Sequence, residues 1–403
     1  MKKDIVFLCQ YFYPEHNSSA TLPYDVATGL AEAGFSVDVI CGMAKEYSYA
    51  QNVPSRETVK GVNIHRIRYL QAKRSKKIGR LINYFSFSFS MMLRLFSLRK
   101  YKSVIVYSNP PILPIVAVMA SILFGTKIVF VSFDVYPEVA LVSGAIGKGS
   151  VIERGMTFIN KMLFKRVSKV IALTDEMKEF ILENRQGISE NNIVTIPNWA
   201  HENAPAVSKQ EARRILGYRD EDFIVSYLGN MGICQEMNTL LEAIEELEEN
   251  ENIKFIFAGH GVKTEEVRRR TENNKNVHMY GFLQGEDFEN VLAASSCCVL
   301  SLEKWMKGLG APSKLYSYLQ AGKPVIAITD TDCYMRKDIE KNGYGVHFGI
   351  SEHKKLAQEI IRLSENPQEE KRMSSRARDF YQKNDKKNNI EKYIEIIMDL
   401  LEK

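Results

Sequence analysis

Two loops in the C-terminal half of the chain combine glycines with the start of a helix. The loop after FIVSYL contains Gly229, Asn230, Gly232 and Gln235, and the loop after IKFIFA contains Gly259, His260 and Gly261. Backbone N–H groups in such a loop, together with the N-terminus of the following helix, form a binding site for phosphate. A single turn of this kind often has only a steric cause, because glycine allows tight bends. Two of them in one half, aimed at the same sheet edge, predict a nucleotide site.

The segment GLGAPSKLYSYLQAGKPVIAIT adds a basic residue to the same chemistry. Gly308, Gly310 and Pro312 form a loop, and Ser313 and Lys314 begin a helix that ends at the pair Ala-Gly before KPVIAIT. A lysine at this place suits a pyrophosphate, which it would bind as a point charge. A solvated surface lysine is the alternative, and both readings stay open for Lys314.

In the N-terminal half, the apolar run KIVFVSF leads directly into DVYPE, residues 134–138. A carboxylate at the C-terminal end of a strand, here Asp134, can hold a sugar hydroxyl or act as an acid or base. It can equally cap the next helix. The first apolar run is followed by a small polar loop, Pro14–Ala20, for which an ordinary capped turn is again the alternative. This loop lacks GxGxxG, which argues against a nicotinamide or flavin dinucleotide.

Short apolar runs alternate with amphipathic stretches along the whole chain. The runs of the N-terminal half are DIVFLCQ, SVDVICG, SVIVYS, KIVFVSF and KVIALT, and those of the C-terminal half are FIVSYLG, IKFIFAGHG, VHMYGF, CCVLSL and KPVIAIT. The alternation is typical of βαβ units with buried parallel strands. Sheets of this kind bind ligands at the carboxyl ends of their strands, where the loops above begin.

A polar, turn-rich segment at residues 196–217 separates the two series and predicts a linker. The length of 403 residues also favours two domains. We therefore predict an α/β protein with two Rossmann-like, doubly wound domains, at residues 1–203 and 204–385. The last helix, residues 386–403, is expected to pack back on the first domain.

The composition excludes several classes of protein. The six cysteines are scattered, with no CxxC pair and no nearby histidine cluster, which indicates reduced thiols in the cytoplasm rather than disulfides or a zinc site. The apolar run near the N-terminus is too short for a signal peptide. The most apolar segment, residues 112–125, is shorter than the roughly 20 residues of a membrane-spanning helix. It predicts a helix of the protein core.

Together these loops resemble the retaining, family 4-type glycosyltransferases of the GT-B fold, over nearly the whole chain. The order and spacing of YFYPE, FDVYPE, IPNW, GNMGICQ, FAGHG and GLGAPSK…YLQAGKPVIA carry the resemblance. It is nearest to the N-acetylfucosaminyl-type and other transferases of bacterial O-antigen, capsule and colanic-acid synthesis. The resemblance implies transfer of a hexosyl or N-acetylhexosaminyl group from a nucleotide-diphosphate sugar, with UDP as the expected nucleotide, to a lipid-diphosphate-linked saccharide.

The resemblance also implies roles for the two domains, with the donor bound by the second, the acceptor by the first, and transfer in the cleft. The donor-binding candidates are Gly229, Asn230, Gly232, Gln235, Gly259, His260, Gly261, Glu303, Pro312, Ser313 and Lys314. The acceptor-binding candidates are Asn17, Ser18, Ser19, Ala20, Asp134, Tyr136 and Glu138, and the catalytic candidates are Asp134 and Lys314. No metal or other cofactor is implied, because basic side chains and helix N-termini stabilise the departing nucleotide diphosphate.

The chain departs from the family pattern in two places. The two glutamates of E-x7-E fall on Leu309 and Ser317, and the Arg and Lys of the first glycine loop are replaced by Asn230 and Gln235. These departures give Lys314 a larger role and leave Glu303 as a substitute ligand for the donor sugar. Two other functions remain open: a sugar-nucleotide 2-epimerase of the same fold, and a non-catalytic partner subunit of a glycosyltransferase complex.

The positive charge of the chain is concentrated in one block. From Thr58 to Phe133 there are thirteen Lys and Arg and no Asp or Glu, so that the remaining residues sum to 5 − 13 = −8. Inside the block, apolar residues recur at helical spacing at Ile78, Ile82, Phe85, Phe89, Met92 and Phe96. The alternation FSFSFS would also fit a short strand, but the helical pattern is longer and we predict a helix.

Basic residues flank this helix, including Lys73, Arg74, Lys76, Lys77 and Arg80 before or at its start. Each basic residue near an anionic leaflet contributes about 1 kcal/mol of binding. We therefore predict a cytoplasmic protein that binds peripherally to the inner face of the cell membrane. Packing of the apolar stripe on the protein's own core is the alternative. Nucleic acid is not expected, because no nucleic-acid motif accompanies the charge.

Overall fold

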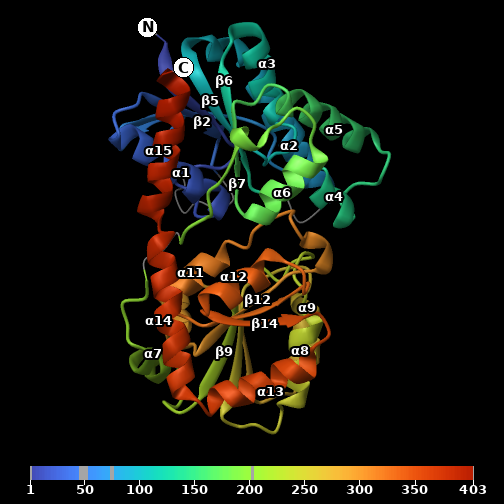
Figure 1. Ribbon diagram of the computed structural model, residues 1–403, viewed down its shortest axis with the longest axis vertical. Helices are drawn as coiled ribbons and strands as arrows, with labels where there is room; N and C mark the ends of the chain where they lie inside the picture. The colour runs from blue at the N-terminus through green and yellow to red at the C-terminus, as the bar shows by residue number, and fades with distance from the viewer. Residues whose placement is uncertain (1, 45–52, 73–76, 201–203, 403) are drawn as a thin grey trace. The chain divides into compact units, whose positions relative to one another are not determined.

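The structure is a computed structural model that describes residues 2–44, 53–72, 77–200 and 204–402, with the elements labelled in Figure 1. The chain divides into two compact units. Unit 1 takes the residues up to 200 together with 308–311 and those from 386 onward, and unit 2 takes 204–307 and 312–385. The predicted boundary between residues 203 and 204 lies outside the described residues.

The described residues of unit 1 form an eight-stranded sheet in the order β3-β4-β2-β1-β5-β6-β7-β8. Its strands are β1 (Lys3–Leu8), β2 (Val37–Gly42), β3 (Arg56–Val59), β4 (Val62–Ile67), β5 (Tyr101–Tyr107), β6 (Lys127–Ser132), β7 (Lys169–Ala172) and β8 (Ile193–Thr195). Neighbouring strands are parallel, except for the antiparallel pair β3–β4. The strand order reverses between β1 and β5, which is the switch point where doubly wound sheets bind ligands.

Helices cover both faces of this sheet (Figure 1). They are α1 (Ser18–Glu32), α2 (Lys77–Met92), α3 (Pro114–Phe124), α4 (Glu138–Val142), α5 (Val151–Phe164), α6 (Asp175–Asn184) and α15 (Lys386–Glu402), with short 3-10 helices η1 (Leu95–Lys100) and η2 (Glu190–Asn192). Alternate residues of β1 enter two apolar clusters, one with α2, α3, α5 and α6, the other with α1 and α15. The last helix, α15, therefore packs on α1 inside unit 1.

Unit 2 has a six-stranded parallel sheet in the order β11-β10-β9-β12-β13-β14 among its described residues. The strands are β9 (Phe223–Leu228), β10 (Ile253–Ala258), β11 (Val277–Tyr280), β12 (Cys297–Ser301), β13 (Val325–Thr329) and β14 (Gly345–Gly349). This is the Rossmann order 3-2-1-4-5-6, with its switch point between β9 and β12. The prediction of two Rossmann-like, doubly wound domains is confirmed.

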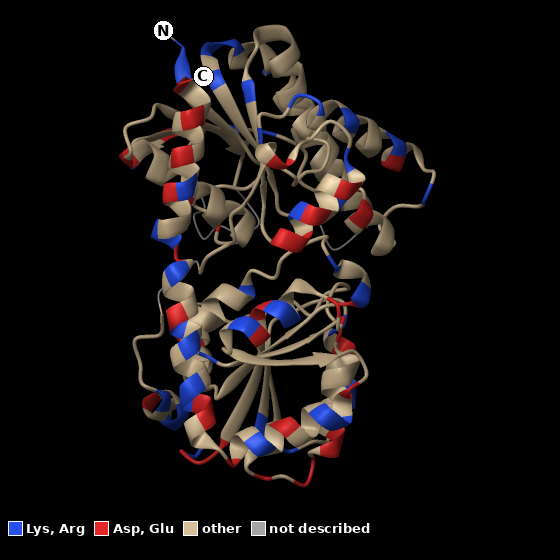
Figure 2. Ribbon diagram, in the orientation of Figure 1, with Lys and Arg blue, Asp and Glu red and all other residues tan. Residues whose placement is uncertain are grey.

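The helices of unit 2 connect these strands and cover their faces. They are α7 (Lys209–Leu216), α8 (Asn238–Glu246), α9 (Thr264–Thr271), α10 (Gly285–Ala294), α11 (Lys314–Gln320), α12 (Tyr334–Asn342), α13 (His353–Ser364) and α14 (Pro367–Lys383), with the 3-10 helix η3 (Lys304–Met306). Acidic and basic side chains alternate along α13 and α14 (Figure 2). The block without acids, in contrast, lies in unit 1.

The predicted linker at 196–217 is only partly a linker. Ile196 and Trp199 are buried in the core of unit 1, where the indole Nε1 of Trp199 donates a hydrogen bond to Asp25 Oδ2 (2.8 Å). Ser208 caps α7 by accepting a hydrogen bond from the Glu211 N–H (3.2 Å), so the second part of the segment is helical. The polar composition of the segment suggested a linker, but the Trp199 indole orders its first end and the Ser208 cap orders its second end.

The apolar segment 112–125 contains α3, whose buried residues lie in the core of unit 1. In the described part of the chain, no helix combines the length and the apolar character that crossing a membrane requires. The prediction of a helix over the FSFSFS segment is also confirmed, because α2 runs from Lys77 to Met92.

Candidate active site

The two glycine loops at the ends of β9 and β10 pack directly against each other. The Met231 N–H donates to the carbonyl of His260 (2.9 Å). A Cβ on Gly259 would lie 1.9 Å from the carbonyl oxygen of Gly229, and one on Gly261 would lie 2.2 Å from that of Met231. Both positions also have positive φ, at 140° and 159°. Close packing of the loops therefore accounts for the glycines at 259 and 261 without any bound phosphate.

The first loop differs from the predicted phosphate site. The Gly232 N–H donates to Gln235 Oε1 (2.9 Å), so this amide is already satisfied. Helix α8 begins at Asn238, and the buried carboxylate of Glu236 accepts a hydrogen bond from the Thr239 N–H (3.2 Å) at its N-terminus. A side-chain anion thus occupies the helix end where the sequence predicted a phosphate. This hydrogen bond occupies one amide of the helix terminus, and phosphate binding at this terminus stays a prediction.

Lys314, in contrast, has the properties of an anion-binding residue. Its Nζ is buried, and among the described residues it has no hydrogen-bond partner. The ammonium lies 3.7 Å from the ring centroid of Tyr227, and a Cβ on Gly229 would lie 3.9 Å from Nζ. Burial lowers the pKa of Lys314 to about 7. A buried cation without a counter-charge is unfavourable, so an entering anion would gain the full benefit of pairing with it.

The neighbours of Lys314 hold it beside the first glycine loop. The Tyr227 hydroxyl donates to the carbonyl of Asn230 (3.0 Å), which links the ring under the ammonium to the loop. Pro312 and Ser313 immediately precede α11, and the carbonyl of Pro312 accepts a hydrogen bond from the Leu315 N–H (3.3 Å). The structure therefore brings together Lys314 and the loop at Gly229 and Asn230, as the sequence predicted for a donor site.

Lys263 connects three loops of unit 2 and was not predicted. Its Nζ lies 2.6 Å from Glu303 Oε1 and donates to the carbonyl of Gln235 (2.6 Å). The Glu303 N–H donates to the carbonyl of Cys234 (2.9 Å). Glu303, the candidate ligand for the donor sugar, thus lies at the switch point between β9 and β12 with its charge balanced. A basic residue two positions after FAGHG was the only sequence signal for Lys263.

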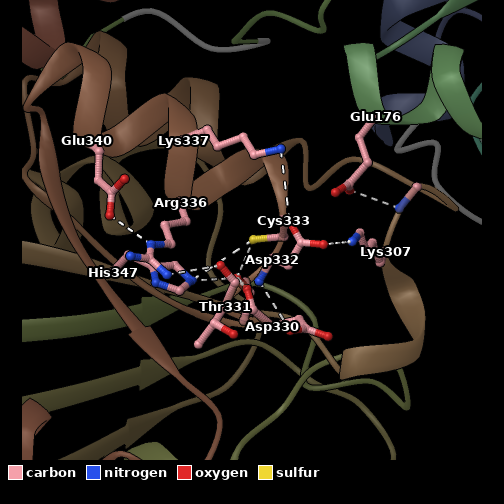
Figure 3. A network of polar contacts seen from close by, with 12 residues as sticks. Glu176, Lys307, Asp330, Thr331, Asp332, Cys333, Arg336, Lys337, Glu340 and His347 are labelled. Carbon is pink, nitrogen blue, oxygen red and sulfur yellow. Dashed lines mark hydrogen bonds and ion pairs between the residues drawn. The ribbon is translucent and has the colours of Figure 1, made fainter.

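A polar network surrounds the loop after β13, which also ends at this sheet edge (Figure 3). Asp332 lies between two lysines, 2.6 Å from Lys307 Nζ and 4.0 Å from Lys337 Nζ. Thr329 Oγ1, at the end of β13, lies 2.8 Å from Cys333 Sγ and 2.9 Å from His347 Nε2. The lysines offset the acidic charge of the loop, which would otherwise disfavour a diphosphate nearby. Sequence analysis missed this network because the loop contains no glycine.

In unit 1, Asp134 follows β6 in a strongly ordered turn. Ser108 Oγ accepts hydrogen bonds from the N–H groups of Phe133 (3.0 Å) and Asp134 (3.1 Å). Asp134 forms an isolated bridge with Gly310 of the segment 308–311, which belongs to unit 1. Burial raises the pKa of Asp134 to about 6. The aspartate does not cap α4, which begins only at Glu138, so the capping alternative is wrong.

Asp134 also lines a small cavity of about 10 Å³, the size of about one water. The polar residues around it are Ser108, Ser132, Asp134, Tyr136, Asn160 and Arg185. Tyr136 and Glu138, predicted to bind acceptor, are near Arg185: its Nη2 donates to the Tyr136 carbonyl (3.1 Å) and pairs with Glu138 Oε2 (2.5 Å). Arg185 and Asn160 were not predicted, because they come from helices far along the sequence.

The loop Asn17–Ala20 begins α1, at the carboxyl end of β1. Asn17 is the residue before the helix but its side chain makes no capping bond, and its buried Oδ1 has no partner within the described part of the chain. Gln10, between β1 and this loop, is 1% exposed, and both atoms of its amide group lack a partner among the described residues. These atoms lie by the switch point of the unit 1 sheet. Gln10 was missed because it reads as part of an apolar strand.

The apolar stripe predicted on α2 lies on the outside of the protein. In the predicted stripe Ile78, Phe89 and Phe96 are 71%, 65% and 69% exposed, and Ile82 and Phe85 are also exposed, whereas Met92 is partly buried against the core. Leu93, just after α2, is 72% exposed, and Phe87 on the opposite side of the helix is fully buried. The alternative, that the stripe packs on the protein's own core, therefore holds only for Met92. Of the predicted membrane-contact residues, Arg80 is exposed, only the backbone of Lys77 is described, and Lys73, Arg74 and Lys76 lie outside the described residues.

Part of the basic block has a structural role instead. Arg66 pairs with Glu57 (2.5 Å) and its Nη2 donates to the carbonyl of Tyr13 (2.6 Å), in the loop after β1. Lys102 pairs with Asp4 (2.7 Å). The exposed bases near the stripe are Arg80, Arg94, Arg99 and Lys100. Within the described ranges, no group of three or more His, Cys, Asp and Glu side chains is placed to hold a metal ion.

Comparison with known families assigns both units to one class. Residues 208–380 match the family model "Glycosyl transferases group 1", and residues 20–199 match "Glycosyl transferase 4-like domain". The two folds and these two matches, one in each half of the chain, support a glycosyltransferase of the GT-B, family 4 type.

Individual relatives agree with this class. The probable glycosyltransferase WbjE of Pseudomonas aeruginosa is 25% identical over 67% of this chain and 67% of its own length. The putative colanic acid biosynthesis glycosyl transferase WcaI of Escherichia coli is 20% identical over 62% of this chain, and the match spans 63% of that relative, less than two thirds. The crystal structure of Anabaena HepE in complex with UDP and glucose superposes with a TM-score of 0.70 at 15% identity, covering 98% of this chain and 99% of that one.

Proposed function

We propose that this protein transfers a hexosyl or N-acetylhexosaminyl group, with retention of anomeric configuration, from a UDP-sugar to a lipid-diphosphate-linked saccharide in cell-surface polysaccharide synthesis. The main support for a UDP-sugar donor is the ammonium of Lys314, which is buried beside Gly229 and has no hydrogen-bond partner among the described residues. The complex of HepE with UDP and glucose and the name of the colanic acid relative support the donor class and the pathway.

The reaction places growing negative charge on the departing nucleoside diphosphate. Lys314 lies in a desolvated setting where a fixed cation stabilises such charge strongly. The paired Lys263 and Glu303 hold the loops around it in place and orient the donor sugar. We propose that no metal ion takes part, so that EDTA leaves the rate unchanged.

The direct test is release of a nucleoside diphosphate from a panel of nucleotide sugars, with and without a prenyl-diphosphate-linked saccharide. Acceptor-dependent release from one donor, with ¹H NMR showing the same anomeric configuration in donor and product, is the expected result. Interconversion of free nucleotide sugars would instead indicate the epimerase. Turnover only after addition of another transferase would indicate the partner subunit, and no turnover in any mixture would refute an enzymatic role.

The exposed stripe of α2 supports the lipid-linked acceptor and contact with an anionic membrane. Apolar side chains of one helix face that remain in water are unfavourable unless another surface covers them. An interfacial helix buries such a face at the boundary of headgroups and acyl chains, while flanking bases interact with anionic lipid. The stripe has Arg80 near its start and Arg94, Arg99 and Lys100 near its end. A lipid-diphosphate acceptor would be available at that surface.

The double variant Phe89→Ser/Leu93→Ser should bind vesicles of phosphatidylglycerol and phosphatidylethanolamine at least about tenfold more weakly, because burying one such side chain stabilises by about 1.5–3 kcal/mol. Co-sedimentation with the vesicles measures this. Ile215→Ser, which removes an exposed apolar side chain from α7, is the control and should bind like the wild type. Unchanged binding of the double variant would show that the stripe does not contact lipid.

A further inference from the structure

A groove on unit 1 lies between α4, α5 and α6, and Glu138 is the one residue of its lining that the sequence predicted to bind acceptor. Its volume is about 320 Å³, in the range of small-molecule sites. Its lining consists of Pro137, Glu138, Leu141, Glu153, Thr157, Asn160, Lys161, Phe164, Asn184, Arg185 and Gln186. All of these residues belong to unit 1, so the groove is complete within one compact body.

The groove contains a buried donor that the protein does not use. The side chain of Arg185 is 10% exposed, and its Nη2 is held by Glu138 and the carbonyl of Tyr136. Its Nε is buried and has no hydrogen-bond partner within the described residues. The guanidinium also lies 5.9 Å from the ring centroid of Phe164. A buried donor of this kind is costly unless a ligand or water accepts its hydrogen bond.

The charges of the lining favour a neutral ligand. Two acidic residues, Glu138 and Glu153, are offset by two basic residues, Lys161 and Arg185, so the sum is 2 − 2 = 0. An anionic group would compete with Glu138 for Arg185. A sugar ring, in contrast, has hydroxyls that accept from a guanidinium and donate to a carboxylate at the same time.

Three amide side chains, those of Asn160, Asn184 and Gln186, add further donors and acceptors to the lining. Phe164 and Leu141 provide apolar surface for the C–H faces of a ring. The combination of paired charges, amides and an apolar wall suits a neutral polyhydroxylated molecule better than a lipid or a nucleotide.

The groove shares part of its lining with the small cavity at Asp134. Asn160, Phe164 and Arg185 line both the groove and the small cavity at Asp134. Asn160 Nδ2 donates to the carbonyl of Tyr136 (2.6 Å), two residues after Asp134. A saccharide bound in the groove would therefore lie close to the turn that carries Asp134.

We infer that the α4–α6 groove is a saccharide subsite, which binds a neutral mono- or disaccharide portion of the acceptor through Arg185, Glu138 and Asn160. This inference rests on the proposed function, because it places the acceptor glycan of that reaction. It also identifies Arg185 and Asn160 as determinants of acceptor specificity.

The test uses Thr157→Trp, which fills the groove from the exposed face of α5, and Phe158→Trp as the matched control. Thr157 lines the groove, whereas Phe158 is exposed on the same helix and does not line it. The probes are methyl glucoside, methyl galactoside, methyl N-acetylglucosaminide, fucose, chitobiose and lactose, measured by saturation-transfer NMR on the full chain. Methyl glucuronide and inorganic pyrophosphate are the anionic comparisons.

At least one neutral probe should give a signal with the wild type and with Phe158→Trp, and at least about tenfold less with Thr157→Trp. Pyrophosphate should leave that signal unchanged. The inference is overturned if no neutral probe binds, if binding survives Thr157→Trp, or if pyrophosphate displaces the sugar. Acceptor-dependent release of nucleoside diphosphate by the wild type, measured on the same preparation, separates this failure from failure of the proposed function.

Discussion

Replacing Lys314 by Met is expected to lower the affinity for a nucleoside diphosphate by about 10- to 100-fold, because a hydrogen bond to a charged group contributes about 1.5–3 kcal/mol. The same change should make the ligand-free protein more stable, since Met has a similar length and removes a buried cation that has no hydrogen-bond partner among the described residues. Loss of binding together with a gain in stability is difficult to explain by misfolding. Isothermal titration with UDP and thermal unfolding without ligand measure the two effects.

The pH dependence follows from the lowered pKa of Lys314, about 7 against 10.5 in the unfolded chain. Below pH 7 the residue is protonated in both states, and the unfavourable burial of its charge is fully present. Between pH 7 and about 10.5 the unfolded chain binds the proton and the folded chain does not, so the stability of the wild type rises with pH. The stability difference between Lys314→Met and the wild type should therefore be largest below pH 7 and should disappear towards pH 10.5.

Binding of the diphosphate has the opposite trend, because only the protonated lysine attracts it. Wild-type affinity should fall as the pH rises above 7, and the variant should lack this dependence. Lys341→Met, which changes an exposed lysine of α12, is the control and should leave affinity and stability unchanged. A variant at 314 that binds UDP like the wild type would remove the central observation of the proposed function.

The sequence predicted those strands that are buried on both faces. β1, β6 and β9 are nearly continuous apolar runs, and each was identified. β4 was missed because VNIHRI alternates apolar and polar residues. β3 was missed because it pairs with β4 across a hairpin turn at Lys60 and Gly61, both of which have positive φ. β3 is the edge strand of this sheet and β4 lies next to it, and strands of this kind depend on pairing more than on their own composition.

Sequence analysis predicted a site residue best where the side chain itself indicates one kind of ligand. Lys314 in a loop between a strand and a helix indicated an anion site, and the structure shows an unsatisfied ammonium there. The glycine loops were ambiguous, because the same residues serve close packing and phosphate binding. Only the contacts of Gly259 and of the Glu236 carboxylate distinguish the two. The first joins Gly259 to Gly229, which is distant in sequence, whereas the second is a local hydrogen bond from the Thr239 N–H at the start of α8.

The acid-free block, residues 58–133, also shows a question that the sequence alone did not answer. Periodicity identified the apolar stripe on α2 but not whether it faces the core or solvent. That choice depends on the other face, where Asn83 exchanges two hydrogen bonds with the backbone of Ala72 (2.7 and 3.0 Å) and Phe87 is buried. The buried side chains of Asn83 and Phe87 thus face the core, which is not the orientation that hydrophobicity alone favours.

Replacing Asp134 by Asn should lower kcat by about 10²- to 10³-fold, the range expected for loss of a group that transfers a proton or holds a reacting hydroxyl. Burial raises the pKa of Asp134 to about 6, so the carboxylate is mostly ionised at pH 7 but close to the pH at which a base works best. We propose that it accepts the proton of the acceptor hydroxyl. The wild-type rate should then fall as the pH falls through 6, and the residual rate of Asp134→Asn should not.

Stability distinguishes this role from a structural one. Because the folded pKa of Asp134 lies above the value of 3.8 for the unfolded chain, ionisation of the buried carboxyl costs stability as the pH rises from about 3.8 to 6. Asp134→Asn should thus be at least as stable as the wild type at pH 7, and it should bind UDP normally, since Lys314 is intact. Asp175→Asn, in the exposed first turn of α6, is the control carboxylate and should keep its kcat. An unchanged kcat in Asp134→Asn, or a loss of activity that parallels unfolding, would contradict proton transfer by Asp134.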